Sequence, residues 1–64
     1  MYTAKLFDDL FSSDPVTIIH DCRSKTLLEA LQYATDKAAD FNAPGFDAIV
    51  RIDMYNDGVQ EGSF

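Results

Sequence analysis

The sequence predicts a small α+β domain in which one helix packs on one face of a three-stranded antiparallel sheet. Three segments of the 64-residue chain indicate this fold class. Residues 16–22 (VTIIHDC) and 46–55 (FDAIVRIDMY) have the composition and alternation of strands, and the segment between them has the spacing of an amphipathic helix. The length corresponds to a single domain, residues 1–64, which buries only about 60% of its unfolded surface.

The N-terminal segment has two interpretations. As a strand, residues 2–7 separate into two faces, with Tyr2, Ala4 and Leu6 on one and Thr3, Lys5 and Phe7 on the other. As a helix, residues 3–11 would gather their Leu and Phe side chains on one face, with Thr3 as the cap. We favour the strand, because the predicted strand 16–22 needs a hairpin partner and a sheet of only two strands would be weak. Residues 12–15 (SSDP) supply the turn between the two.

A helix is expected to begin after Thr26. Glu29 follows three residues later, which is the spacing of a capping box. The helix is expected to end at residues 42–45 (NAPG), where Pro and Gly interrupt it. Its apolar positions form one stripe: Leu27, Ala30, Leu31, Ala34, Ala38 and Phe41.

The last predicted strand alternates from residue 46 to residue 55. One face carries Phe46, Ala48, Val50, Ile52 and Met54, and the other carries Asp47, Ile49, Arg51, Asp53 and Tyr55. A turn at residues 56–58 (NDG) follows, and residues 59–64 form either a frayed tail or a short fourth strand. A crossover through the helix places this strand beside the first, giving the order ββαβ along the chain and 3-1-2 across the sheet.

Charge restricts the partners of the chain. Its formal net charge is -6, with 11 acidic residues against 5 Lys and Arg and a pI of about 4.2. Such a surface repels nucleic acid and membrane phosphates and attracts proteins with basic grooves. A hydrophobic content of 47% is too high for a disordered chain, and one cysteine allows no internal disulfide. With no signal peptide or membrane-spanning run, we expect a cytoplasmic protein that binds neither membrane nor nucleic acid directly.

Residues 26–51 carry a resemblance to a known family. The helix opening T-L-x-E-A-L, at residues 26–31, and the Pro44-Gly45-Phe46 turn resemble the small inhibitors of bacterial RNA polymerase found in T7-type phages. This resemblance implies a ββαβ fold and a host enzyme as the partner. The family's last strand carries two Arg residues spaced by one, whereas this chain has Arg51 and Asp53, so no contact residue is carried over. The helix after a hairpin also resembles the N-terminal half of antitoxins of the HicB type.

No catalytic or metal-binding set is expected. His20 and Cys22 are two positions apart on a predicted strand and would leave the same face, but no third and fourth ligand follows at a recognisable spacing. A Cys/His nucleophile pair would lack an orienting group. We therefore expect no enzyme activity, no metal and no cofactor, and we expect both residues to be structural.

The candidate partner-binding residues are acidic and aromatic. They comprise Glu29, Tyr33, Asp36 and Asp40 on the outer helix face, and Asp47, Ile49, Arg51, Asp53 and Tyr55 on the outer face of the last strand. Three further acids, Asp8, Asp9 and Asp14, crowd the first turn. An exposed apolar patch of Ile19, Ile49, Tyr55 and Phe7 is expected on the sheet face away from the helix, where a host protein or a second copy in a homodimer would dock. The competing interpretation is that the acids serve solubility alone.

The function that these features favour is a small, non-catalytic, phage-type inhibitor acting in the host cytoplasm. Its acidic surface would bind the basic nucleic-acid-binding groove of a host enzyme, such as RNA polymerase, a CRISPR effector, or a restriction or repair nuclease, and could do so as a nucleic-acid mimic. The alternative is an antitoxin or small regulatory partner that occludes a basic toxin.

Overall fold

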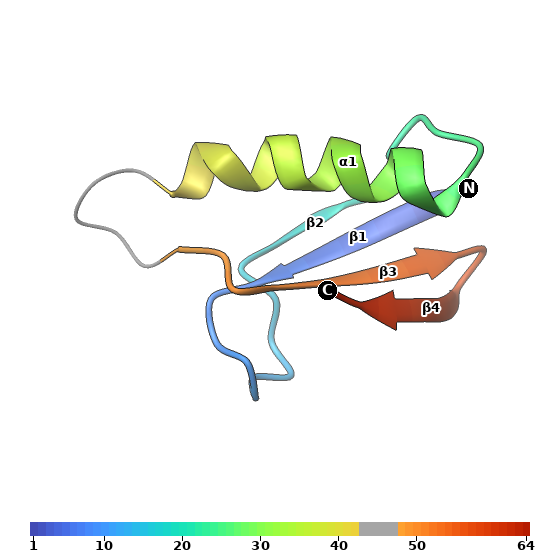
Figure 1. Ribbon diagram of the computed structural model, residues 1–64. Helices are drawn as coiled ribbons and strands as arrows, with labels where there is room; N and C mark the ends of the chain where they lie inside the picture. Colours follow the sequence, from blue (N-terminus) through green and yellow to red (C-terminus); the bar gives the residue numbers. More distant parts are fainter. Residues whose placement is uncertain (43–47) are drawn as a thin grey trace.

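A four-stranded antiparallel sheet forms one layer of the molecule. The structure, a computed structural model, describes residues 1–42 and 48–64. The strands are β1 (Tyr2–Phe7), β2 (Thr17–Ile19), β3 (Arg51–Asn56) and β4 (Val59–Ser63), and their order in the sheet is β2-β1-β3-β4. Helix α1 (Leu27–Ala38), followed by the short 3₁₀ helix η1 (Ala39–Phe41), packs on β1 and β3 (Figure 1). The predicted α+β class and the 3-1-2 strand order are confirmed, with β4 as the additional strand.

The N-terminal segment is a strand and the helical interpretation is wrong. All six residues of β1 pair with β3, and Ala4, Lys5 and Leu6 also pair with β2. The alternation explains this outcome, because it places Ala4 and Leu6 beneath the helix, where both are fully buried. A helix here would leave β2 and β3 without the strand that joins them.

Strand β2 is shorter than the predicted segment 16–22. Only Thr17, Ile18 and Ile19 are in the strand, although two backbone bonds continue the contact with β1. The N–H of Val16 donates to the carbonyl of Leu6 (2.7 Å), and that of Cys22 donates to the carbonyl of Tyr2 (2.9 Å). Beyond Ile19 the chain turns toward the helix, and Arg23 adopts a φ of 52°. That bend ends the pairing.

The predicted cap and apolar stripe of the helix are present. Thr26 has extended backbone angles, and its hydroxyl accepts a hydrogen bond from the N–H of Glu29 (3.3 Å). Ala30, Ala34 and Ala38 form the buried side, so the helix can approach the sheet closely, while Leu27 and Leu31 pack at its flanks. Phe41, which the stripe predicts to be buried, is exposed. The end of the helix extends past the ends of β1 and β3 (Figure 1), and Phe41 is 39% exposed.

The last predicted strand begins later than expected. β3 spans Arg51–Asn56 rather than residues 46–55, and of the predicted segment Phe46 and Asp47 lie outside the described residues. The predicted turn is confirmed, because Asp57 (φ 49°) and Gly58 (φ 86°) both have positive φ values, as a two-residue type I′ hairpin requires. The segment after it is strand β4 and not a frayed tail.

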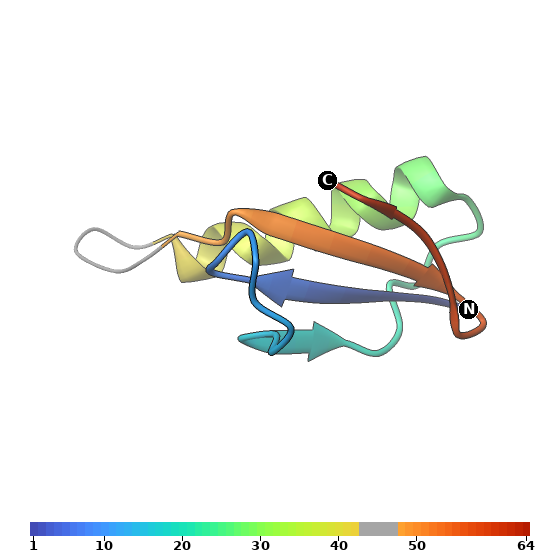
Figure 2. The same cartoon turned by 90° about the horizontal axis from the view of Figure 1, so that it is seen from below.

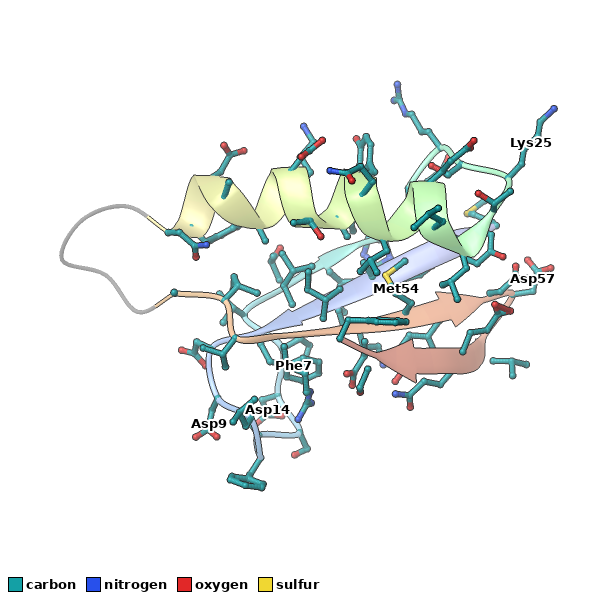
Figure 3. All side chains as sticks on the ribbon, viewed as in Figure 1. Phe7, Asp9, Asp14, Lys25, Met54 and Asp57 are labelled. Atoms are coloured by element: carbon teal, nitrogen blue, oxygen red, sulfur yellow. The ribbon has the colours of Figure 1, made fainter. Side chains whose placement is uncertain are left out.

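The two faces of the sheet have different environments. The buried cluster lies between α1 and the sheet, and its largest fully buried side chains are Leu6, Met54 and Cys22. Figure 3 shows Met54 between helix and strands, whereas Phe7 lies on the opposite side of the sheet. The loop between β1 and β2, residues 8–16, lies over part of that opposite face (Figure 2). Among the described residues, no helix is long and apolar enough to cross a membrane.

Candidate functional site

The outer face of α1 carries a row of carboxylates. Glu29, Asp36 and Asp40 are all exposed, and spacings of seven and four residues put them on one side of the helix. The side-chain amide of Gln32 donates to Asp36 (3.3 Å), which is the only hydrogen bond of these three carboxylates to a described residue. None of the three carboxylates forms an ion pair with a described cation. The row therefore presents uncompensated negative charge to solvent.

Helix stability does not account for the position of two of these acids. Glu29 lies in the first turn, where its charge is favourable against the positive end of the helix dipole. Asp36 lies in the last turn and Asp40 just beyond it, where cations are preferred and an acid costs about 0.3–1 kcal/mol. Aspartate is also a poor helix former. Their placement is thus unfavourable for the fold.

Tyr33 belongs only partly to this face. Its ring is half-buried and packs against the edge of the core, although its spacing places it beside the acidic row. The ammonium of Lys37 lies 5.5 Å from the ring centroid. Tyr33 therefore forms a partly covered border of the row and not a free aromatic anchor.

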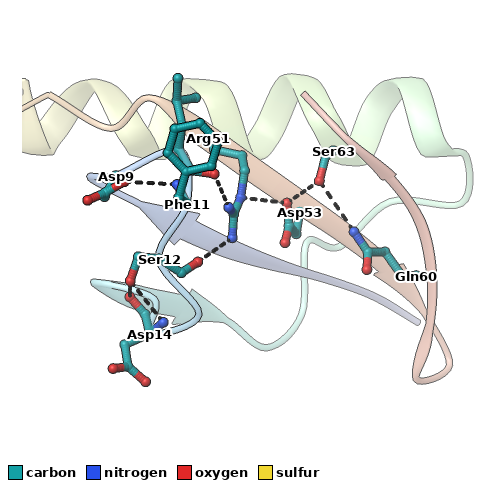
Figure 4. Close-up of polar contacts among 9 residues, drawn as sticks. Asp9, Phe11, Ser12, Asp14, Arg51, Asp53, Gln60 and Ser63 are labelled. Carbon is teal, nitrogen blue, oxygen red and sulfur yellow. Dashed lines mark hydrogen bonds and ion pairs between the residues drawn. The ribbon is translucent and has the colours of Figure 1, made fainter.

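The strand residues of the predicted site lie on the other side of the molecule. Asp53 is not displayed to solvent as expected, because it is buried (7% exposed) and stands beside Arg51. Its Oδ1 is 3.1 Å from Arg51 Nε, but the N–H does not point at that oxygen, so the contact is an ion pair without a hydrogen bond. The hydroxyl of Ser63 on β4 donates to the same carboxylate (Figure 4). Asp53 thus adds nothing to the acidic surface.

Arg51 has a structural role that its sequence position did not indicate. Its guanidinium lies 3.8 Å from the centroid of the Phe7 ring, and its two terminal nitrogens donate to the carbonyls of Leu10 and Ser12. One side chain therefore joins β3 to the loop 8–16 and covers Phe7. The sequence contained no signal for this role, because the predicted strand 46–55 placed Arg51 in its middle and the pairing of Arg51 with Phe7 follows only from the structure.

The predicted exposed apolar patch is not present. Ile19 and Ile49 pack against the core on the helix side, and Phe7 is buried beneath Arg51. Ile49 precedes β3, so the alternation that predicted its face does not apply, and its N–H donates to the side chain of Asn42 (2.9 Å). Tyr55 does lie on the open face, with the ammonium of Lys5 4.5 Å from its ring centroid. Asp47 lies outside the described residues.

His20 and Cys22 do not form a pair. His20 is exposed, whereas Cys22 is fully buried in the core, because the strand ends at Ile19. Burial, and secondarily the charge of Asp21, raise the pKa of the Cys22 thiol. The thiol therefore stays protonated at neutral pH and is a poor nucleophile. In residues 1–42 and 48–64, no group of three or more His, Cys, Asp or Glu side chains could hold a metal ion.

The aromatic residue that is most exposed within residues 1–42 and 48–64 was not among the predicted site residues. Phe11, within the loop 8–16, is 93% exposed, and its neighbour Leu10 is also exposed. The sequence contained a signal for it, because Leu10 and Phe11 follow two Asp residues and precede the turn SSDP. In the strand interpretation of the N-terminus, no element remained to bury them.

Comparisons with known proteins identify no relative. No protein-family model matches the chain, no curated protein is similar to it, and no solved structure resembles its fold to a significant degree. The candidate surface is therefore defined by the geometry described above.

Proposed function

We propose that this chain is a small, non-catalytic inhibitor of the phage type, which binds the basic nucleic-acid-binding groove of a host enzyme through the outer face of α1. The observation that carries the proposal is the row of Glu29, Asp36 and Asp40, which is exposed and free of ion pairs among the described residues. Two members of the row stand where they oppose the helix dipole. An unfavourable placement of this kind is consistent with a role in recognition.

The row acts by charge complementarity and not by detailed mimicry of a duplex. Eleven residues separate Glu29 from Asp40, which corresponds to roughly 16 Å along a helix axis. Duplex DNA carries about ten charges over that length, against three carboxylates here. The formal net charge of -6 adds a long-range field that steers the chain toward a basic surface and raises the association rate.

The partner class follows from the same charges. Grooves that bind nucleic acid combine high positive charge with an open, elongated shape, and a 64-residue acidic domain can occupy part of such a groove. RNA polymerase, CRISPR effectors, and restriction or repair nucleases all have grooves of this kind. The helix motif shared with the phage inhibitors of RNA polymerase makes that enzyme the first to test.

The experiment is capture from a bacterial lysate with three forms of the immobilised chain. The first is the wild type, and the second is the row variant E29Q/D36N/D40N. The third is a control, D21N/D57N/E61Q, which changes the net charge by the same amount at exposed acids away from the row. We expect the wild type and the control to retain a nucleic-acid-binding enzyme at low salt and to release it at high salt.

The row variant is expected to retain at least about tenfold less of that enzyme, because steering and complementarity are lost together. Equal capture by the row variant and the control would refute the proposal, since total charge alone would then decide binding. Capture of a small basic protein in place of a large enzyme would identify the chain as an antitoxin.

A further inference from the structure

The loop between β1 and β2 holds its exposed aromatic residue in a fixed backbone position. The Arg51 guanidinium donates to the carbonyls of Leu10 and Ser12, the residues on either side of Phe11. The N–H of Phe11 itself donates to Asp9 Oδ1 (2.8 Å), as Figure 4 shows. Hydrogen bonds therefore hold the backbone at three successive residues, Leu10, Phe11 and Ser12.

A second local network closes the other side of the loop. The N–H of Asp14 donates to the hydroxyl of Ser12 (3.0 Å), and that hydroxyl lies 3.2 Å from the carbonyl of Asp14. Arg51 thus fixes the loop to the sheet at residues 10 and 12, and its charge is compensated by Asp53 (3.1 Å). Despite this order, the Phe11 side chain is 93% exposed.

The surroundings of the ring are strongly acidic. Asp8, Asp9 and Asp14 are exposed, and residues 8–16 contain no Lys or Arg. Figure 3 shows Asp9 and Asp14 on this loop, on the side of the sheet away from the helix. An exposed apolar ring on a loop that carries three carboxylates is complementary to an apolar pocket bordered by Lys and Arg. The same carboxylates disfavour an anionic membrane, nucleic acid and a second copy of this acidic chain.

We infer that Phe11, with Leu10 beside it, is an anchor that inserts into an apolar pocket with a basic rim on a protein partner. The ordered backbone reduces the entropy lost on binding, because Phe11 has only its two side-chain torsions to fix. Exposed aromatic residues of this kind commonly dominate the binding energy of an interface. The inference rests on the proposed function in that the partner is a basic protein, but it assigns a second contact surface on the opposite side of the sheet from α1.

A random peptide library selected against the immobilised chain tests the inference without the natural partner. We expect the selected peptides to combine Lys or Arg with large apolar residues. The affinity of one such synthetic peptide is then measured for the wild type, F11A, D8N/D14N, the row variant E29Q/D36N/D40N, and V59A. Val59 is an exposed apolar residue on β4 and serves as the matched control.

F11A is expected to lower the affinity for the peptide by at least about 30-fold, the usual effect of removing an interface anchor. V59A is expected to change this affinity by less than about threefold. D8N/D14N is expected to weaken binding mainly at low salt. Because the Phe11 side chain is 93% exposed, F11A is expected to keep the wild-type unfolding midpoint, which separates lost binding from lost structure.

Each other outcome also decides the question. Peptides that bind through the row and are unaffected by F11A would refute the anchor and leave the proposed function intact. Peptides that need Phe11 but not the row would support the anchor as a contact surface separate from the row. A library that yields no basic, apolar peptides would refute the inference. So would concentration-dependent self-association, or vesicle binding, that F11A abolishes.

Discussion

Arg51→Met is the substitution that tests the structural account of the open sheet face most severely. Methionine keeps an apolar stem against Phe7 but removes the guanidinium. The variant therefore loses the ion pair with Asp53 (3.1 Å) and the hydrogen bonds to the carbonyls of Leu10 and Ser12. It leaves the Asp53 carboxylate with Ser63 as its remaining hydrogen-bond partner among the described residues.

The size of the effect follows from burial. The side chains of Arg51 and Asp53 are 19% and 10% exposed, so solvent screens this pair far less than a surface pair. Removing one member of a buried pair costs about 3–5 kcal/mol, and the hydroxyl of Ser63 reduces that penalty toward the lower value. The two loop carbonyls can bind water instead and add at most about 1 kcal/mol each. We expect a loss of about 3–5 kcal/mol, which is a large part of the roughly 3–10 kcal/mol available to a domain of this length.

Urea unfolding followed by circular dichroism measures this loss. The control is Lys5→Met, because Lys5 also lies over an aromatic ring of the open face but forms no ion pair with the residues that the structure describes. It is expected to cost less than about 1 kcal/mol. A double-mutant cycle with Asp53→Asn should give a coupling energy of at least about 1.5 kcal/mol. A loss below about 1 kcal/mol for Arg51→Met would refute the role given to Arg51.

Three further predictions concern the core, the helix cap and the hairpin. Burial raises the pKa of the Cys22 thiol, so the folded state binds that proton more tightly than the unfolded state does. The free energy of unfolding should therefore fall as pH rises above the ordinary thiol pKa of about 8.5. Urea titrations across that pH range measure this decline, and Cys22→Ala should abolish it. Thr26→Ala removes the cap of α1 and should cost about 1 kcal/mol by urea unfolding, whereas Thr26→Ser should cost little. Gly58→Ala, at a φ of 86°, should lower stability by about 1–2 kcal/mol. Gly62→Ala should cost less, because its added Cβ meets only the outer end of the half-exposed Phe64 ring (2.8 Å), which can move aside; equal losses of thermal stability at the two glycines would contradict this reasoning.

The fold was largely predictable because its elements are defined locally. The Thr26 cap, the alanine and leucine positions that follow it, and the Asp57-Gly58 turn are each set by neighbouring residues, and each was predicted correctly. The strand boundaries were less accurate. The boundaries of β3 depend on where β1, its pairing partner, ends. The side chains of residues outside the paired stretch, such as Ile49, are oriented by packing against the core and not by strand alternation.

The candidate surface was predictable only where it lies on the helix. Helical spacing alone puts Glu29, Asp36 and Asp40 on one face, and the structure displays them there. Asp53 was wrongly placed among the exposed acids, because its burial depends on Arg51 two residues earlier and on Ser63 across the hairpin. Phe11 was missed for a similar reason. Its loop is held by the same arginine, forty residues later in the chain, and no local pattern encodes that contact.

The dependence of the association rate on ionic strength tests the central claim most directly. With the captured partner purified, the rate constant is measured from low to high salt for the wild type and for E29Q/D36N/D40N. If the carboxylates on α1 form a recognition face, the wild-type rate should fall at least about tenfold over that range, and the row variant should start slower and vary much less. A wild-type rate that stays constant with salt, or that the row variant reproduces, would contradict the account.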